Sequence, residues 1–256
     1  MLELHRVGKT FRAKNALVEA SREVDLSVAS GSITALVGPS GCGKSTLLHM
    51  IAGLYRPTSG SILQDGVPVT DVNPNVGYMT QKDNLFPWMS VRRNVAMPLE
   101  FAGVPAEVRR DRTDAVLRAV GLDGFADRYP TELSGGMRKR TSLARMLLYE
   151  PRTFLLDEPF GTLDPQLRLA MHQLLIELWL KGKQTIVLVT HDLEEAIALA
   201  QRVVVLTRRP ARVAHEQEID LPYPRDVRNI RFTERFKELY DTLWERLRAQ
   251  YEEGLL

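Results

Sequence analysis

The stretch Gly38-Pro-Ser-Gly-Cys-Gly-Lys-Ser45, followed by Thr46, decides the fold of this chain. It matches the pattern G-x-x-x-x-G-K-[ST], in which glycines let the backbone curl so that several N–H groups point at one anion. A buried-strand pattern over residues 32–37 precedes it, and a helical pattern over 44–52 follows it. Because a helix begins with the positive end of its dipole, this strand–turn–helix context predicts a phosphate-binding loop in an α/β nucleotide-binding domain.

The individual residues of this loop have expected roles. Lys44 is expected to reach the β- and γ-phosphates, and the Ser45 hydroxyl to bind Mg²⁺. Cys42 occupies a variable position and needs no catalytic role. An accidental glycine turn is the alternative, but it would not require a strand before it and a helix after it. We therefore predict that the nucleotide site includes Gly38, Pro39, Ser40, Gly41, Cys42, Gly43, Lys44, Ser45 and Thr46.

Two carboxylates, Asp157 and Glu158, come directly after the apolar run at 153–156. Ligands of open α/β sheets bind beyond the carboxyl ends of the strands. Asp157 is therefore expected to hold Mg²⁺, directly or through water. Glu158 is expected to polarise the water that attacks the γ-phosphate. Alone, Asp-Glu-Pro could equally be a polar strand exit, but the phosphate loop favours function.

Short β-rich runs alternate with helical patterns, which is typical of a parallel or mixed sheet covered by helices. Between about residues 90 and 150 strand signals are scarce, which predicts a helical subdomain inserted between strands. The expected strands are 76–79, 153–156, 185–189 and 202–206, and the expected helices are 91–101, 106–120, 134–149, 166–180 and 193–200.

The tail from 226 to 253 is polar, with a stripe of apolar residues at helical spacing. This stripe either packs back on its own domain or contacts a partner. Its members are Phe232, Phe236, Leu239, Tyr240, Leu243, Trp244 and Leu247.

The composition of the 256 residues limits the possible classes of protein. Cys42 is the single cysteine, so no intrachain disulfide is possible and a reducing compartment is expected. The net charge of +2 gives no sign of a nucleic-acid partner. The N-terminal residues do not resemble a signal peptide, and no apolar run approaches the roughly 20 residues that span a bilayer. If the protein works at a membrane, we expect it to do so through a partner.

A second Gly-rich stretch, Leu133-Ser-Gly-Gly-Met137, stands at the start of a predicted helix. Ser134, Gly135 and Gly136 would form a second anion site there. The alternative is a plain helix cap made by Ser134.

On these residues the chain resembles the ATP-binding cassette (ABC) family along nearly its whole length. Five stretches carry the resemblance, in this order along the chain: Walker A (38–46), Gln81, the signature (133–137), Walker B (155–159) and Thr190-His191-Asp192. Phe11 stands where the family carries an adenine-stacking aromatic residue, and Gly161-Thr-Leu-Asp164 at its D-loop. The chain departs from the commonest pattern at Met137, at Gly161-Thr, and at Lys139, where many members have Gln.

The resemblance implies an α/β P-loop NTPase fold with a mixed sheet core, an N-terminal antiparallel β part and an inserted helical subdomain. We expect a single ABC ATPase domain over 1–256. Its catalytic core would cover about 1–89 and 151–220, the helical subdomain about 90–150, and the C-terminal helical tail about 221–256.

The resemblance also implies hydrolysis of ATP by a head-to-tail dimer with a second copy or a homologous ATPase chain. Ser134, Gly135 and Gly136 of one chain would close over the γ-phosphate of ATP held by the other. Asp164 would lie across the dimer interface.

Within one chain, the resemblance implies that Gln81 touches Mg²⁺ and the attacking water. His191 would contact the γ-phosphate, Glu158 would be the catalytic base, and Phe11 would stack on adenine. Ordinary alternatives are a polar residue at a strand end for His191, a loop amide for Gln81 and a core residue for Phe11.

Three stretches resemble importers, and in particular the nitrate/sulfonate/taurine branch: 190–200, Asn84-Leu-Phe-Pro-Trp-Met-Ser-Val91 and Leu221-Pro-Tyr-Pro-Arg-Asp226. The branch implies uptake of a small solute, such as an oxyanion, through separate transmembrane permease subunits. An extracytoplasmic solute-binding protein would take part indirectly, and the chain would be peripheral at the cytoplasmic face of the inner membrane. Phe86 and Trp88 are expected either to contact the permease or to fill the local core.

Two other classes remain as alternatives. Soluble ABC ATPases of nucleic-acid or translation processes usually carry a long coiled-coil insertion or tandem cassettes, and neither is seen here. The basic stretches 138–140 and 208–209 are too short to indicate nucleic acid. An exporter ATPase is the second alternative, although many exporters carry a fused membrane domain.

Overall fold

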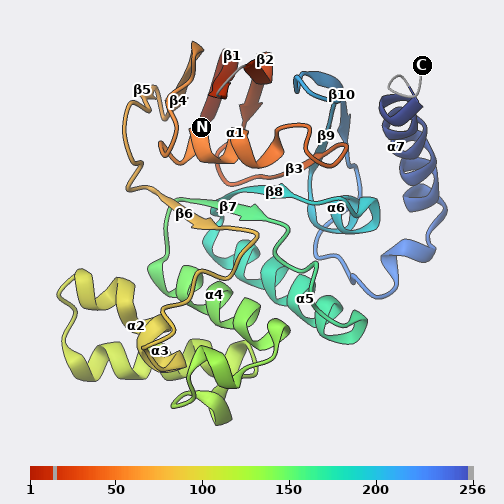
Figure 1. Ribbon diagram of the computed structural model, residues 1–256. Coiled ribbons are helices and arrows are strands. Elements are labelled where there is room, and N and C mark those ends of the chain that lie inside the picture. The colour runs from red at the N-terminus through yellow and green to blue at the C-terminus, as the bar shows by residue number, and fades with distance from the viewer. Residues whose placement is uncertain (14–15, 253–256) are drawn as a thin grey trace.

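The computed structural model describes residues 1–13 and 16–252 (Figure 1). A six-stranded sheet lies at its centre, and all neighbouring strands pair in parallel except β10, which is antiparallel to β9. Its order is β10 (Val213–Glu218), β9 (Arg202–Leu206), β3 (Ile33–Val37), β8 (Thr185–Val189), β7 (Thr153–Asp157) and β6 (Val76–Met79). Every residue of β3, β7 and β8 is buried, as expected of parallel strands covered on both faces.

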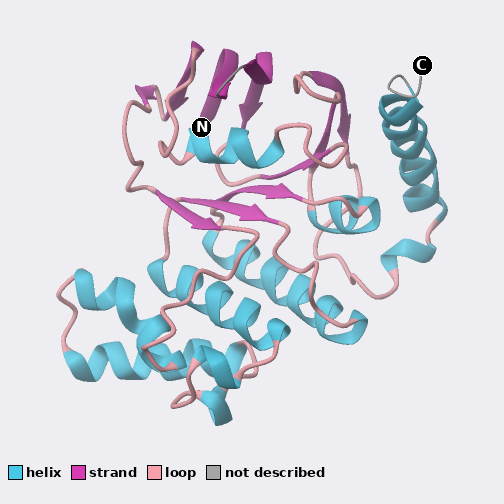
Figure 2. Ribbon diagram, in the orientation of Figure 1, coloured by secondary structure: helices cyan, strands magenta, loops and turns pink. Residues whose placement is uncertain are grey.

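A four-stranded antiparallel sheet covers one side of the molecule, at the top of Figure 2. Its order is β2 (Ala16–Val28), β1 (Leu2–Ala13), β4 (Ser59–Gln64) and β5 (Val67–Pro68). One face of this sheet and helix α1 (Lys44–Ile51) share a core with the central sheet, in which Leu4, Leu26, Leu48 and Val187 are buried. This core fixes α1, and with it the phosphate loop, against the end of β3.

The other face of the central sheet packs on helices α4 (Gly135–Tyr149), α5 (Pro165–Gly182) and α6 (Leu193–Leu199). Helices α2 (Val91–Phe101) and α3 (Ala106–Ala119) pack with α4 around a separate apolar cluster that includes Val95, Leu117 and Ala144. These helices form the lower left of Figure 1. The mixed sheet, the antiparallel part and the inserted helices confirm the expected fold class.

Three short 3₁₀ turns, Asp123–Phe125, Pro130–Glu132 and Ile230–Phe232, join these elements. The fully buried amide of Asn94 holds the loop before α2, donating to the carbonyls of Phe86 and Met89 and accepting from the Phe86 N–H.

In the described part of the chain, no helix combines the length and the apolar character needed to cross a bilayer.

The C-terminal helix α7 (Glu234–Glu252) packs against the same core as the central sheet. The buried residues of the stripe are Phe236, Leu239, Leu243 and Leu247. This part of the stripe therefore packs on its own chain, which is the first of the two alternatives that the sequence left open. Two members of the stripe are not buried with the others: Phe232 is 75% exposed and Trp244 is 50% exposed.

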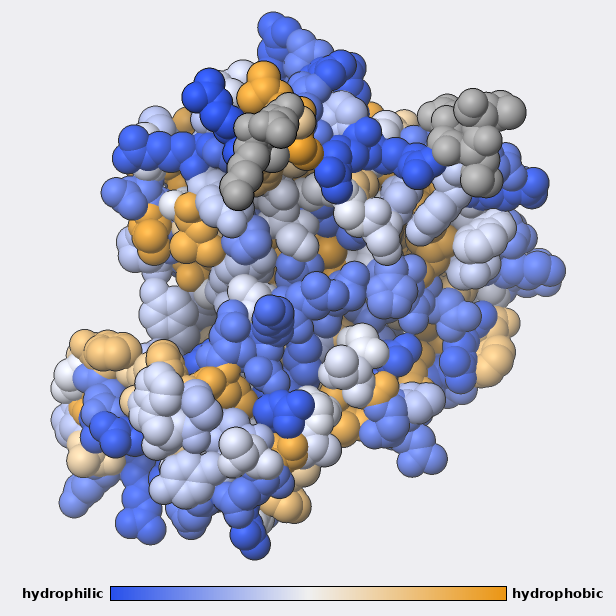
Figure 3. Space-filling model, in the orientation of Figure 1, coloured by the Kyte–Doolittle hydropathy of each residue, from blue (hydrophilic) through white to orange (hydrophobic). Residues whose placement is uncertain are grey.

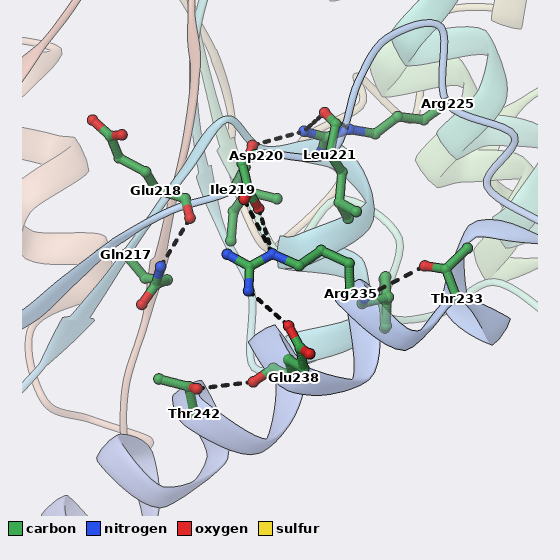
Figure 4. Close-up of polar contacts among 11 residues, drawn as sticks. Gln217, Glu218, Ile219, Asp220, Leu221, Arg225, Thr233, Arg235, Glu238 and Thr242 are labelled. Atoms are coloured by element: carbon green, nitrogen blue, oxygen red, sulfur yellow. Dashed lines mark hydrogen bonds and ion pairs between the residues drawn. The ribbon is translucent and has the colours of Figure 1, made fainter.

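Two arginines hold the segment that leads into α7 (Figure 4). Arg225 is only 1% exposed, and its guanidinium donates to the carbonyls of Ile197, Ala198, Ala200, Ile219 and Leu221. Three of these carbonyls end helix α6, where a cation is favourable. Arg235 pairs on the surface with Asp220 and Glu238. The tail is thereby fixed at a buried point and at an exposed one.

Element boundaries agree with the sequence predictions to within a few residues, except in the tail. Helix α5 begins at Pro165 because Asp164 caps it and proline fits the first helical position. Helix α7 begins only at Glu234. The Asp226 side chain accepts from the Arg228 N–H in a turn, a 3₁₀ turn follows at Ile230–Phe232, and the Thr233 hydroxyl accepts from the Phe236 N–H at the start of α7.

Candidate functional site

Four neighbouring parallel strands, β3, β8, β7 and β6, carry the predicted functional residues at their carboxyl ends. The phosphate loop follows β3, His191 follows β8, and Gln81 follows β6. Asp157 is the last residue of β7 and Glu158 comes next. Stretches that are far apart in the sequence therefore meet at one edge of the sheet, which is where α/β proteins bind ligands.

The phosphate loop closes over its own lysine. The Lys44 side chain is buried, and its Nζ atom donates to the carbonyls of Gly38 at 2.7 Å and Pro39 at 2.9 Å. Gly43 precedes helix α1 with φ +127°, and a Cβ there would lie 2.5 Å from the Ala20 carbonyl oxygen. Only glycine fits this position, so the loop can present its amides at the positive end of α1.

Asp157 and Ser45 bring two oxygen ligands together beside this loop. The Asp157 carboxylate is buried, accepts a hydrogen bond from the Tyr78 hydroxyl at 3.3 Å, and lies close enough to the Ser45 side chain to interact with it. Burial raises the pKa of Asp157, although the interactions with Ser45 and Tyr78 act to lower it. Burial and the Asp157 charge also raise the pKa of Tyr78, which keeps it a donor. Carboxylate and hydroxyl oxygens are the hard ligands that suit Mg²⁺.

The Glu158 carboxylate lies between the other two predicted catalytic residues. Its Oε2 atom is 3.3 Å from the Gln81 amide nitrogen, and its Oε1 atom is 3.4 Å from His191 Nδ1. Gln81 is exposed and the His191 side chain is 62% exposed, so neither belongs to the core. Glu158 has a left-handed backbone with φ +48°, and its N–H donates to the Val189 carbonyl. The arrangement leaves a partly exposed carboxylate flanked by an amide and an imidazole.

Asp192 and Arg168 form a network, not indicated by the sequence, that holds the loop that carries His191. Asp192 caps helix α6, accepting from the Glu195 N–H, while Arg168 lies 3.6 Å from its other carboxylate oxygen. Arg168 also donates to the Leu163 carbonyl, one residue before Asp164. The D-loop and the loop of His191 are therefore joined through one guanidinium.

The second Gly-rich stretch stands apart from this cluster. Ser134 caps helix α4 by accepting from the Met137 N–H at 3.3 Å, and it is exposed. Gly135 and Gly136 form the first turn of that helix. Among the described residues, no hydrogen bond joins this turn to the phosphate loop. Asp164 likewise caps α5 on an exposed surface.

Phe11 lies outside the apolar clusters, half-buried on β1. Its ring packs edge-on against Tyr55 at 5.6 Å, and Lys9 Nζ lies 5.3 Å from its centroid. Tyr55 in turn contacts His49, which contacts Tyr78. This aromatic chain leads from Phe11 to the hydroxyl that binds Asp157. Period-2 alternation in the predicted strand could have singled out Tyr78, but nothing in the sequence pointed to His49 or Tyr55.

The stretch after Gln81 carries exposed aromatic surface. Trp88 is 69% exposed, while Phe86 is half-buried and its ring centroid lies 5.3 Å from that of Trp88. Core packing therefore covers part of the Phe86 side chain and little of the Trp88 side chain. Most of the face in Figure 3 is hydrophilic, and hydrophobic side chains interrupt it in patches at the top and upper left and over the helices at the lower left.

Comparisons with known proteins agree with this geometry. A family model described as ABC transporter matches residues 21–161. The nitrate import ATP-binding protein NrtD of Synechocystis sp. is 44% identical over 86% of this chain and 83% of its own length. The taurine import ATP-binding protein TauB of Burkholderia pseudomallei is 39% identical over 97% of both chains.

A solved structure extends the likeness to the fold. The dimeric, post-hydrolysis state of the ATP-binding cassette MJ0796, bound to ADP and Pi, superposes with a TM-score of 0.80 at 31% identity. The match covers 87% of this chain and 100% of that one. With the phosphate loop, the paired carboxylates and the signature turn in place, this chain belongs to the ABC transporter ATP-binding family.

Proposed function

We propose that this chain is the ATP-hydrolysing subunit of an ABC importer, and that it works as a dimer to drive uptake of a small solute through separate permease subunits. The observation that carries the enzymatic part is the Glu158 carboxylate, which lies within 3.5 Å of both the Gln81 amide and the His191 imidazole. A carboxylate held in this way is suited to orient one water and accept its proton.

The proposed reaction is attack of that water on the γ-phosphorus of ATP, which breaks the bond from the γ-phosphorus to the β–γ bridging oxygen and releases ADP and inorganic phosphate. Glu158 accepts the proton, Gln81 orients the water, and His191 donates a hydrogen bond toward the γ-phosphate. The amides at 38–46 and Lys44 bind the phosphates, while Phe11 stacks on adenine. Ser45 and Asp157, with Gln81, would hold Mg²⁺, which would neutralise charge on the phosphates.

The exposed signature turn supports a head-to-tail dimer. Ser134, Gly135 and Gly136 lie at the positive end of helix α4 and do not bond to their own phosphate loop. We infer that they close over ATP held by a second copy, with Asp164 at the interface. Self-association agrees with the dimeric cassette to which the chain is similar.

The proposed transport role rests on what the similar proteins are named for. Those named for nitrate, aliphatic sulfonate and taurine import are 37–44% identical to this chain. We propose a small oxyanion as cargo, with Trp88 and Phe86 contacting the permease. The chain would then be peripheral at the cytoplasmic face of the inner membrane, and a solute-binding protein would act indirectly.

Purification of the tagged chain from detergent-solubilised membranes tests this proposal. We expect permease subunits to co-purify, and we expect Trp88→Ala to release them without lowering the basal ATPase activity of the isolated chain. Phe101→Ala is a matched control, because Phe101 is also an exposed aromatic residue, at 83%. Co-purification of ribosomes or nucleic acid in place of a permease would favour a soluble ABC ATPase.

A further inference from the structure

Helix α4 holds the loop of Gln81 with a buried lysine. Lys139 is 5% exposed, and its Nζ atom donates to the carbonyls of Thr80, at 3.1 Å, and of Gln81. Burial lowers the pKa of Lys139, while the Asp83, Asp157 and Glu158 carboxylates act to raise it. An ammonium group buried against main-chain carbonyls fixes the backbone at the residue whose amide reaches Glu158.

Two arginines of the same helix hold the residues that follow Gln81. Arg138 Nε lies 2.8 Å from the Asp83 carboxylate, and Arg145 Nη1 donates to the Asn84 carbonyl at 3.1 Å. Asn84 itself donates to the Thr80 hydroxyl at 2.7 Å. The loop is therefore attached to α4 at several points, of which Lys139 is the nearest to Gln81.

The same helix begins at the signature turn. Ser134 caps α4, and Lys139 lies little more than one helical turn further along. A helix moves as a rigid body over so short a distance, so a shift of Ser134 displaces Lys139 and the two carbonyls it binds. One side chain thus connects the turn proposed to face the partner's ATP with the glutamine proposed to face the chain's own ATP.

We propose that Lys139 is a positioning residue that couples the two ATP sites of the dimer, setting Gln81 at one site according to the engagement of the signature turn at the other. This inference rests on the proposed function. Glutamine, which many family members carry here, has a shorter side chain and one NH₂ group, whereas lysine offers three donors on a longer stem. We therefore expect the coupling to be stronger with Lys139 than with glutamine.

The test uses hydrogen exchange on full-length protein that carries Glu158→Gln, with and without ATP. In that background ATP is expected to protect both the segment 80–84 and the segment 134–138. Lys139→Met keeps the apolar stem and removes the donors. It should keep protection at 134–138 and lose most of the ATP-dependent protection at 80–84, with Lys139→Gln intermediate.

Arg140→Met is the matched control. Arg140 is the next residue of α4 and also binds main-chain carbonyls, those of Val120 and Gly121, but away from Gln81. It should leave both segments protected by ATP. In chains with Glu158 intact, Lys139→Met should lower the Hill coefficient for ATP toward 1, and Arg140→Met should not.

The outcomes separate this inference from the proposed function. If Lys139→Met retains ATP-dependent protection of both segments and an unchanged Hill coefficient, Lys139 does not couple the sites. If the parent Glu158→Gln protein shows no ATP-dependent protection at 134–138, the trans role of the signature fails instead. Should Lys139→Met not fold, Lys139→Gln provides the same comparison.

Discussion

The Nδ1 atom of His191 lies 3.4 Å from the Oε1 atom of Glu158, and the Gln81 amide contacts the other oxygen of that carboxylate. The two side chains come from loops that follow different strands, β8 and β6, on either side of β7. The orientation of Glu158 therefore depends on three strands being in register. This makes the Glu158 carboxylate the most informative position to change.

Replacing Glu158 with Gln keeps the shape and removes the base. We expect ATP binding to remain and turnover to fall by about 10²–10⁴-fold, the usual contribution of general base catalysis. Phosphate release measures the turnover, and size-exclusion chromatography with ATP should show a trapped dimer. Turnover close to that of the parent chain would exclude Glu158 as the base.

Ser134→Arg places a bulky cation on the exposed cap of α4 and should abolish hydrolysis while ATP still binds to the isolated chain. Lys44→Ala should instead lose ATP affinity. Mixing the two inactive proteins should restore activity, because a mixed dimer contains one site with an intact phosphate loop and an intact signature. Absence of any recovery, with mixed dimers demonstrated, would contradict the head-to-tail arrangement.

Tyr78→Phe removes the hydroxyl that donates to Asp157 at 3.3 Å. A hydrogen bond to a charged group contributes on the order of 1.5–3 kcal/mol to stability, and its loss frees the Asp157 carboxylate to turn away from Ser45, so Mg²⁺-dependent ATP binding should weaken by up to about tenfold. Titration of Mg²⁺ against a fluorescent ATP analogue measures this. Tyr149→Phe, which loses a hydroxyl bond to the Pro74 carbonyl, is the control and should leave the Mg²⁺ dependence unchanged.

Arg225→Met would leave several buried carbonyls without a donor, since Arg225 is 1% exposed. We expect the free energy of unfolding to fall by about 3 kcal/mol or more. Urea denaturation measures the change. Arg235→Ala, which removes only surface pairs, should scarcely shift the midpoint. Equal effects of the two variants would show that the Arg225 cluster does not stabilise the tail.

The sequence predicted the central strands and the inserted helices well, because short apolar runs and helical periodicity are local signals. It located Gln81, Asp157, Glu158 and His191 by motif, and the structure brings them to one edge of the sheet. It did not place β1, β2, β4, β5 and β10 individually, since pairing between distant strands is not encoded in a short window.

Side chains that act through other side chains were also invisible in the sequence. The contacts of Tyr78 with Asp157 and of Arg168 with Asp192 join residues that are distant in the chain. In the sequence, Lys139 stands out only as a departure from the family pattern. Its hydrogen bonds to the loop of Gln81 depend on how α4 packs beside β6, which no local pattern reports.

Helix α7 buries Leu239 and Leu243 in the same cluster as Leu188 of β8 and Val205 of β9, and β8 leads directly into the loop of His191. The tail is consequently part of the cooperative unit that folds around the sheet. Cleavage by a protease between β10 and α7 should therefore unfold the ATPase domain instead of releasing the tail as a separate module. Calorimetry should record one transition for the sheet and the tail together.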